Sequence, residues 1–382
     1  MAYELNMDPV ALRARNEPTR DPTTGHEFSL RNLLEAYRRG AEHFNWQPRP
    51  PRTQREGEWL VGQGVASAEY AVLRQPASAK ICLYADGTAV VKAAAHEMGM
   101  GTATVQLQHA ADRLGLPISN VSFQYGDTDL PKAAIAGGSM QTISVAAGIS
   151  AAAEELLKQL FDLAKKAELL PLRDFAADKV ELKTGGLYHQ QQAAQGRAYA
   201  DILKAADLGF LEVEGTSAMP LEIMKYSMQS YGAQFAEVRV NEITGEVRVA
   251  RWVGAFDVGR ILNVKTATSQ LRGGIIMGIG MALTEETLFD ERTGRIINAS
   301  LAEYHVPVNA DVPPIDAIFL DIPDEHTPLG AHGIGEIGIT GAVAAVANAI
   351  FNATGTRIRS LPLTLDKVLA GGRGRVQTWP RR

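Results

Sequence analysis

Apolar positions near the start of the chain recur at the spacing of amphipathic helices. Asp8 and Pro9 form a helix start, with a capping side chain followed by a proline at the first helical position. A second helix is predicted from a cap at Ser29 to Phe44, because its apolar residues fall on one face. We therefore interpret residues 1–57 as a helical segment, the tail of a preceding subdomain.

The pattern then changes to the alternation of apolar and polar residues that is typical of strands. The runs 81–91 and 235–252 each alternate on both sides of a glycine-containing turn, which predicts two β-hairpins. Each hairpin is followed by a loop rich in acid and glycine and then by a helix. This repeated order predicts an α+β fold with two related hairpin-loop-helix subdomains, at residues 58–212 and 213–382.

Helices are predicted where apolar residues predominate after the loops. The candidate helices are 105–114, 144–167, 269–285 and 342–350. The stretch 174–197 is polar, and we expect it to be an exposed excursion.

The loop at residues 329–341 is the strongest candidate for chemistry. Its glycines allow positive φ angles and close approach to a bound group, and it opens directly into an apolar helix whose N-terminus favours an anion. Glu336 is its one carboxylate, and a carboxylate facing a dry cavity can act as a general base. A structural role stays open, because a carboxylate in a first helical turn is often only a partner for the helix dipole.

Three further loops contain glycine and hydrogen-bonding groups. We expect loops 97–102, 137–139 and 259–274 to converge with 330–341 in a crevice that suits a large polar or phosphate-bearing cofactor. The polar residues after Gly138 could equally be helix caps; they are Ser139, Gln141, Thr142 and Ser144. Gln270, in an apolar and glycine-rich helix, is about as easily a satisfied structural amide as a ligand contact.

Composition narrows the choice of function. The chain has 382 residues, 46% of them hydrophobic, and a net charge of −5, so we expect neither nucleic acid nor a membrane surface as its main partner. No apolar run reaches the length of a membrane span. The single cysteine, Cys82, excludes a disulfide framework, a thiolate zinc site and an iron–sulfur cluster held by this chain alone.

The motifs of several common enzyme classes are missing from the sequence. The histidines show no pair at metal-ligand spacing, so no protein-ligated metal is indicated. There is no Gly-x-Ser-x-Gly elbow and no P-loop, so acyl and phosphoryl transfer have no support. The remaining candidates for chemistry are the loops rich in hydrogen-bond donors and the carboxylate of Glu336.

Together, these motifs resemble the molybdenum-binding large subunit of the xanthine dehydrogenase and aldehyde oxidase family. The likeness covers nearly the whole chain and is closest to bacterial aldehyde oxidoreductases of the periplasmic three-subunit type. The segments that carry it are Gly330 to Glu336, His96 to Thr102, Asp257 to Arg260 with Gln270, Leu301 to Pro307, and Leu361 to Lys367.

The resemblance implies a molybdopterin cofactor with molybdenum, usually the cytosine dinucleotide form in bacteria, and no protein atom bonded to the metal. Glu336 matches the family's catalytic base. The implied reaction is oxidation of an aldehyde to a carboxylic acid, or hydroxylation of an N-heterocycle, with water as the oxygen source.

The resemblance also implies which residues bind the cofactor, and both subdomains would then be molybdopterin-binding. Met100 stands where the family often has glutamine, so a contact there would use the backbone. The implied cofactor-binding residues are Gly99, Met100, Gly101, Thr102, Gly138, Ser139, Met140, Gln141, Thr142, Ser144, Gln270 and Gly335.

The family's subunit is about twice as long as this chain, which corresponds to its C-terminal half. The missing N-terminal half is therefore an expected partner, together with an iron–sulfur subunit carrying [2Fe-2S] and an FAD subunit. We expect a cytoplasmic location, with the periplasm as the alternative if a partner subunit carries the export signal. The alternative function is a catalytically inactive half that only pairs with a complementary chain.

Overall fold

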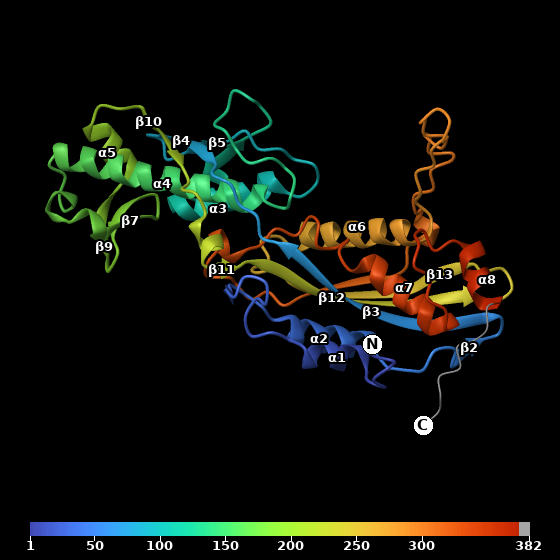
Figure 1. Cartoon of the computed structure of the whole chain (residues 1–382). Helices are drawn as coiled ribbons and strands as arrows, with labels where there is room; N and C mark the ends of the chain where they lie inside the picture. The colour runs from blue at the N-terminus through green and yellow to red at the C-terminus, as the bar shows by residue number, and fades with distance from the viewer. Residues whose placement is uncertain (374–382) are drawn as a thin grey trace. The chain divides into compact units, whose positions relative to one another are not determined.

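The computed structural model of the chain describes residues 1–373, which form two compact units (Figure 1). Unit 1 combines Met1–Ala71, Lys225–Asp324 and the described residues from Ile334 onward. Unit 2 combines Val72–Met224 and Glu325–Gly333. Among the described residues, no helix is long and apolar enough to cross a membrane.

Unit 1 is built on a five-stranded sheet of order β14-β13-β12-β3-β2. Its long central strands, β3 (Trp59–Ala71) and β12 (Gln229–Asn241), are antiparallel and pair along their full length. β13 (Val247–Asp257) is antiparallel to β12, and β14 (Ile315–Phe319) runs parallel to β13. β2 (Gln54–Glu56) pairs with the outer edge of β3.

The two units divide the chain differently from the subdomains predicted at 58–212 and 213–382. Strand β3, which follows residue 58, lies in unit 1 because all of its residues pair with β12. The segment 325–333, from the second predicted subdomain, groups with unit 2. Long-range strand pairing cannot be read from local alternation, which is why the boundaries differ.

Helices cover both faces of the unit 1 sheet (Figure 1). α6 (Val264–Leu283) and α7 (Ala342–Thr354) form one core with the sheet, and α2 (Leu33–Phe44) forms another core on the opposite face. The neighbours Phe235 and Ala236 enter opposite cores, as the alternation of side chains along a strand requires.

Two glycines of β3 let α7 lie directly on the strand. A Cβ atom at Gly64 would overlap backbone atoms of Ala345 and Ala349, and a Cβ at Gly62 would overlap backbone atoms of Ala349 and Ala353. Helix and strand therefore pack backbone to backbone at these positions. The apolar helix predicted at 342–350 is confirmed and ends at Gly355, as expected.

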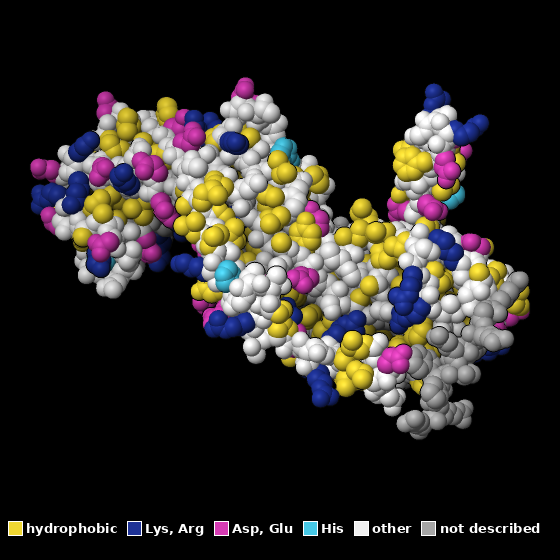
Figure 2. Space-filling view, viewed as in Figure 1, with side chains coloured by type: hydrophobic (Ala, Val, Ile, Leu, Met, Phe, Trp, Pro, Cys, Tyr) yellow, Lys and Arg dark blue, Asp and Glu magenta, His cyan; other side chains and the backbone are white. Residues whose placement is uncertain are grey.

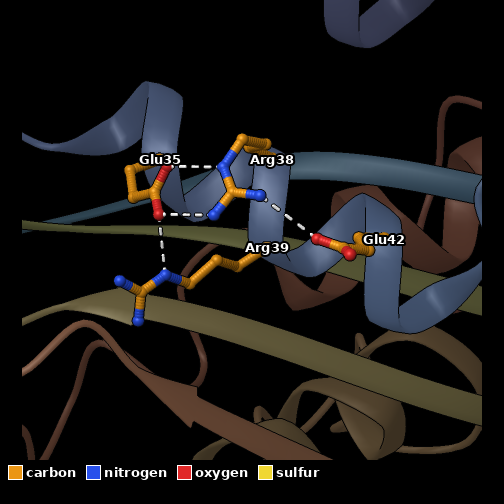
Figure 3. Close-up of polar contacts among 4 residues, drawn as sticks. All are labelled: Glu35, Arg38, Arg39 and Glu42. Carbon is orange, nitrogen blue, oxygen red and sulfur yellow. Dashed lines mark hydrogen bonds and ion pairs between the residues drawn. The ribbon is translucent and has the colours of Figure 1, made fainter.

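Helix α2 buries one face and carries a charged cluster on the other (Figure 3). The carboxylate of Glu35 accepts hydrogen bonds from Arg38 (2.7 Å and 2.8 Å) and from Arg39 (2.7 Å), and Arg38 also contacts Glu42 (3.2 Å). These arginines lower the pKa of Glu35 to about 2. The helix starts at Leu33 with Asn32 at the N-cap, so the predicted cap at Ser29 is wrong.

Unit 2 contains a four-stranded sheet of order β10-β4-β5-β6. The strands are β4 (Ser78–Tyr84), β5 (Ala89–Lys92), β6 (Val121–Gln124) and β10 (Phe210–Thr216). The long helix α4 (Gln141–Lys166) shares one core with this sheet. Both predicted hairpins are confirmed, as β4–β5 in unit 2 and β12–β13 in unit 1.

A second, three-stranded sheet forms in unit 2 where the sequence predicts an exposed excursion at 174–197. That prediction is wrong in part, because Val180 and Leu187 are buried in the core of the unit. The remaining elements of unit 2 are α3 (Thr102–Leu114), β7 (Val180–Lys183), β8 (Gly186–His189), β9 (Gln192–Ala198) and α5 (Tyr199–Ala205).

The remaining elements of unit 1 are short. They are α1 (Pro9–Arg15), β1 (Glu27–Phe28), β11 (Tyr226–Ser227) and α8 (Leu365–Arg373). The start of α1 at Pro9, capped by Asp8, is confirmed. Helices and mostly antiparallel strands in both units confirm the predicted α+β class.

Gly64→Ala should destabilise the chain by about 3 kcal/mol, because the new methyl group forces α7 away from β3. Urea unfolding followed by circular dichroism measures the change. The matched control is Gly273→Ala on α6, where a Cβ meets nothing within 4 Å and alanine favours the helix by about 0.5–1 kcal/mol. Equal stability of the two variants would contradict the close packing of α7 on β3.

Candidate functional site

The first residue of α4 is tied to the first residue of α3 by a buried amide. Gln141 is 3% exposed, and its Nε2 donates to the carbonyl of His96 (2.8 Å) and to the hydroxyl of Thr102 (3.0 Å). Its Oε1 accepts from the N–H of His96 (2.9 Å). One side chain thus joins two helix N-termini and brings the predicted loop 97–102 close to the start of α4, which directly follows the predicted loop 137–139 within unit 2.

The loop before α3 wraps around the carboxylate of Glu97. This carboxylate accepts hydrogen bonds from the N–H groups of Gly99 (2.8 Å), Gly101 (3.0 Å) and Ala103 (3.3 Å). Burial raises the pKa of Glu97, but these backbone donors lower it by more, so the net pKa lies below its usual value. The Gly99 and Gly101 donors that the sequence assigned to a cofactor are therefore engaged by the chain itself.

The N-cap of α4 differs from this arrangement. Met140 is its N-cap residue and makes no side-chain capping hydrogen bond. Gly138 (φ 62°) and Ser139 (φ 55°) lead into the helix in left-handed conformations, and both are half-buried. The N-terminus of a 26-residue helix carries backbone N–H groups and the positive end of the helix dipole, which suit an anionic group.

The first part of the glycine loop 330–341 lies against the turn at Gly138 and Ser139. A Cβ atom at Gly333 would overlap the carbonyl oxygen of Ser139, so only glycine fits there. Both residues belong to unit 2. The structure therefore confirms that the 330–341 loop, in its first part, joins the loop that precedes α4.

The polar residues of the first turn of α4 play different roles. Ser144 is buried, and its hydroxyl accepts from the N–H of Gln75 (3.1 Å), which is a structural contact. Thr142 is half-buried, and its carbonyl accepts from Nε2 of Gln106 (2.9 Å). Gln106 is fully buried, and within residues 1–373 its Oε1 has no hydrogen-bond partner. A bound polar group would complete this network, which fits a cofactor at these loops.

The candidate base, Glu336, lies in unit 1, in a tight turn that is hydrogen-bonded to strand β12 of the sheet. Gln234 of β12 is fully buried, and its Nε2 donates to the carbonyls of Gly338 (2.9 Å) and Thr340 (2.6 Å). Its Oε1 accepts from the indole N–H of Trp252 (3.0 Å). The turn that begins at Glu336 is therefore fixed by a buried three-way network, and Oε2 of Glu336 is itself buried.

Glycines bring α6 against the same turn. A Cβ at Gly338 would lie 2.7 Å from the carbonyl oxygen of Leu271, and one at Gly274 would lie 2.8 Å from the nitrogen of Ile339. Gln270, which precedes Leu271, is half-buried on α6, so its segment packs beside the segment that holds Glu336. Gly335 is exposed.

Tyr70, at the end of β3, is a neighbour of Glu336 that the sequence did not point to. Burial raises the pKa of Tyr70, and the negative charge of Glu336 raises it further. Its phenol is half-buried and stays protonated at neutral pH, so it can donate a hydrogen bond.

The predicted site residues thus form two groups. Residues 99–102 and 138–144 lie in unit 2, whereas Gln270, Gly335 and Glu336 lie in unit 1. Their convergence in one crevice stays a prediction. Sequence reasoning missed Gln106 and Gln234, although a glutamine within an apolar stretch is the signal that could have found both.

No group of three histidine, cysteine or carboxylate side chains able to hold a metal ion occurs within residues 1–373. The donors at the loops are backbone N–H groups, amides and hydroxyls. Such donors suit phosphate and a heterocycle rather than a bare metal ion.

The matches to known proteins agree with this geometry. Residues 39–313 match the family model described as "Molybdopterin cofactor-binding domain". The chain is 37% identical over 374 residues to the aldehyde oxidoreductase molybdenum-binding subunit PaoC of Escherichia coli K12, covering 97% of this chain and 49% of the relative. It is 30% identical over 397 residues to the putative xanthine dehydrogenase molybdenum-binding subunit XdhA of the same strain, covering 95% and 49%.

Solved structures share the fold. Quinoline 2-oxidoreductase from Pseudomonas putida 86 superposes with a TM-score of 0.80 at 23% identity, covering 98% of this chain and 50% of that one. Aldehyde oxidoreductase from Desulfovibrio gigas superposes with a TM-score of 0.75 at 25% identity, covering 98% and 39%.

The chain belongs to the molybdenum-binding subunits of the xanthine dehydrogenase and aldehyde oxidase family, which are molybdopterin-binding oxidoreductases, and corresponds to their C-terminal half. It spans about half the length of the curated relatives that it matches.

Gln234→Leu should lower the free energy of unfolding by about 2–4 kcal/mol, because two carbonyls and an indole N–H lose their buried partner. It should also speed amide hydrogen exchange in residues 336–341. Gln191→Leu, at an exposed position, is the control and should change neither quantity. Unchanged exchange in the turn of the Gln234 variant would show that the amide does not hold it.

The Glu97 loop should loosen in acid. A carboxylate whose folded pKa is lowered stabilises the folded state fully above its unfolded pKa of about 4.5, and this contribution is lost as the pH falls through the lower folded pKa. Amide exchange of residues 99–103, compared between pH 6 and pH 3 (roughly either side of that pKa) after correction for intrinsic rates, measures the effect. Glu97→Gln should remove the pH dependence, whereas Asp127→Asn should leave it. A wild-type loop equally protected at both pH values would refute the role given to Glu97.

Proposed function

We propose that this chain forms the cofactor-binding half of a molybdenum hydroxylase subunit that oxidises an aldehyde to a carboxylic acid with oxygen from water. The observation that carries the proposal is the placement of Glu336 in a glycine turn fixed by the buried amide of Gln234. Rigid positioning is what a general base needs, because a small displacement from the reacting proton costs rate.

The bound molybdopterin would supply a two-electron redox centre that the side chains of this chain lack. The part assigned to Glu336 is to accept the proton of the attacking oxygen nucleophile. The phenol of Tyr70, protonated beside this carboxylate, is suited to donate a hydrogen bond to the carboxylate or to the substrate oxygen.

The binding residues are assigned to different parts of the cofactor. The N-terminus of the 26-residue helix α4, which follows the left-handed residues Gly138 and Ser139, is suited to a phosphate or pyrophosphate. The orphaned Oε1 of Gln106 could accept a hydrogen bond from a bound polar group. Because the family in bacteria usually carries a cytosine dinucleotide, we propose that form here.

Electrons from the reaction need a route to another chain. Cys82 is the single cysteine and its side chain is buried, so this chain alone cannot supply the set of thiolates that a cluster needs. We propose that [2Fe-2S] and FAD are carried by partner subunits, as the resemblance implies.

An aldehyde is preferred over an N-heterocycle as the substrate. The support is the higher identity to the aldehyde oxidoreductase subunit, 37%, than to the putative xanthine dehydrogenase subunit, 30%. The alternative that the chain is an inactive half, which only pairs with a complementary chain, is decided by the following measurement.

Glu336→Gln should lower kcat for aldehyde oxidation about 10²–10⁴-fold, because the amide cannot accept the proton. The variant should retain molybdenum, since no step of binding is assigned to this carboxylate. The assay uses the complex of this chain with its complementary half and electron-transfer partners, a panel of aldehydes and N-heterocycles, and water labelled with ¹⁸O.

Glu42→Gln is the control, because this carboxylate lies on the exposed face of α2 and its side chain is 75% exposed. It should leave kcat unchanged. A molybdenum-loaded complex whose turnover survives in Glu336→Gln would remove the base from the proposal. A loaded wild-type complex that oxidises neither substrate class would favour the inactive half.

A further inference from the structure

Between α6 and β14 the chain forms an arm, defined as residues 286–308, that rises beyond the end of α6 (Figure 1). Nearly all of its residues are exposed, and Asn298 is the one that is buried. The arm is one excursion within unit 1, and no other described strand pairs with it.

The backbone of the arm is nevertheless well specified. Asn298 bridges its two sides, donating to the carbonyl of Glu286 (2.7 Å) and accepting from the N–H of Leu288 (2.9 Å). At the tip, Oδ1 of Asp290 accepts from the N–H of Arg292 (2.9 Å), and Gly294 adopts a φ of 69°. A single antiparallel bridge pairs Phe289 with Ile296.

Many of the exposed side chains of this arm are apolar, whereas a free surface loop carries mostly polar ones. In the space-filling view, apolar side chains show part-way up the arm, lysine or arginine near its tip, and acidic and histidine side chains lower on it (Figure 2). The exposed apolar residues are Leu288 (42%), Phe289 (60%), Ile296 (48%), Ile297 (57%), Leu301 (84%), Val306 (45%) and Val308 (59%).

These two properties together indicate an interface. An isolated two-stranded hairpin is marginally stable in water, and large contiguous apolar patches on a protein surface mark binding sites. A specified backbone that presents apolar side chains avoids the entropy cost of ordering the arm when it binds.

We infer that the arm is the docking surface for the half of the molybdenum-binding subunit that this chain does not span. The curated relatives contain about as much polypeptide again beyond the matched part, since the chain covers 49% of their length. This inference rests on the proposed function for the identity of that half, and it adds the surface that receives it.

The chemistry of the arm favours this occupant over others. Its exposed apolar side chains are flanked by charged ones at the tip (Asp290, Glu291, Arg292, Arg295) and on the stem (Glu286, Glu303), which is the pattern of an apolar interface core with a polar rim. The arm contains more acidic than basic residues, so it does not suit an anionic lipid surface or nucleic acid.

Site-specific photo-crosslinking in the source cells tests the inference. Phe289 is replaced by p-benzoylphenylalanine, the cells are irradiated, and the crosslinked peptides are identified by mass spectrometry. The expected peptides align with the half of the relatives' molybdenum-binding subunit that lies outside the match, whether that half is a separate chain or continuous with this one. The same probe at the exposed Asp178 of unit 2 should not capture those peptides.

Every other outcome overturns the inference: a crosslink to a second copy of this chain, a crosslink to an unrelated protein, or no product from the arm. The readout requires neither molybdenum nor turnover. No crosslink beside an active, molybdenum-loaded complex would reject the docking role of the arm and leave the proposed function standing. A crosslink to the complementary half in a complex without molybdenum or turnover would support the docking role and reject the proposed function.

A substitution gives a second readout. Leu301→Asp, at a side chain that is 84% exposed, should reduce co-purification of the complementary half at least about tenfold without lowering the thermal midpoint of this chain alone. Thr293→Asp at the tip is the matched control and should leave co-purification unchanged. Equal recovery of the complementary half with both variants would contradict the inference.

Discussion

The backbone-to-backbone packing of α7 on β3 determines where the candidate base of unit 1 lies. Gly62 and Gly64 allow it, and a Cβ atom at Gly341, the N-cap of α7, would lie 2.4 Å from the carbonyl oxygen of Ser67, further along the same strand. A helix fixed at both ends in this way leaves the preceding turn no freedom to shift. Glu336 occupies that turn, and Gln234 secures it from the neighbouring strand.

In unit 2 the loops of the candidate site are held by side-chain hydrogen bonds. Its helix starts are joined by the buried amide of Gln141, and the glycines around it are needed for tight turns as much as for access. Glu97 accepts hydrogen bonds from the N–H groups of one loop, whereas Met140, the N-cap residue of α4, makes no side-chain hydrogen bond to its own helix. The glycine-rich loops that look equivalent in the sequence are therefore not equivalent in the structure.

Local patterns predicted the two hairpins, the long helices and the α+β class, because alternation and helical spacing depend on near neighbours. They failed at 174–197, where polar residues alternate with the few apolar residues that enter the core. They also missed Gln234, whose partners Gly338 and Thr340 are more than a hundred residues away in sequence. Residue types alone pointed to Glu336, Gln270 and the glycine loops, and the resemblance to a family supplied the other cofactor-binding residues. The hydrogen bonds of Glu97 and Gln106 follow from the three-dimensional structure and could not be predicted from local patterns.

Binding of molybdopterin by the loops of this chain is measured by the molybdenum content of the chain purified with its complementary half. We expect roughly one molybdenum per wild-type chain by elemental analysis. We expect a large loss in Gly138→Ala, where a Cβ meets a strained φ of 62° and lies 2.9 Å from the Met140 side chain beside the α4 N-terminus. A folded wild-type complex without molybdenum, or a Gly138 variant with an unchanged molybdenum content, would contradict binding of molybdopterin by these loops.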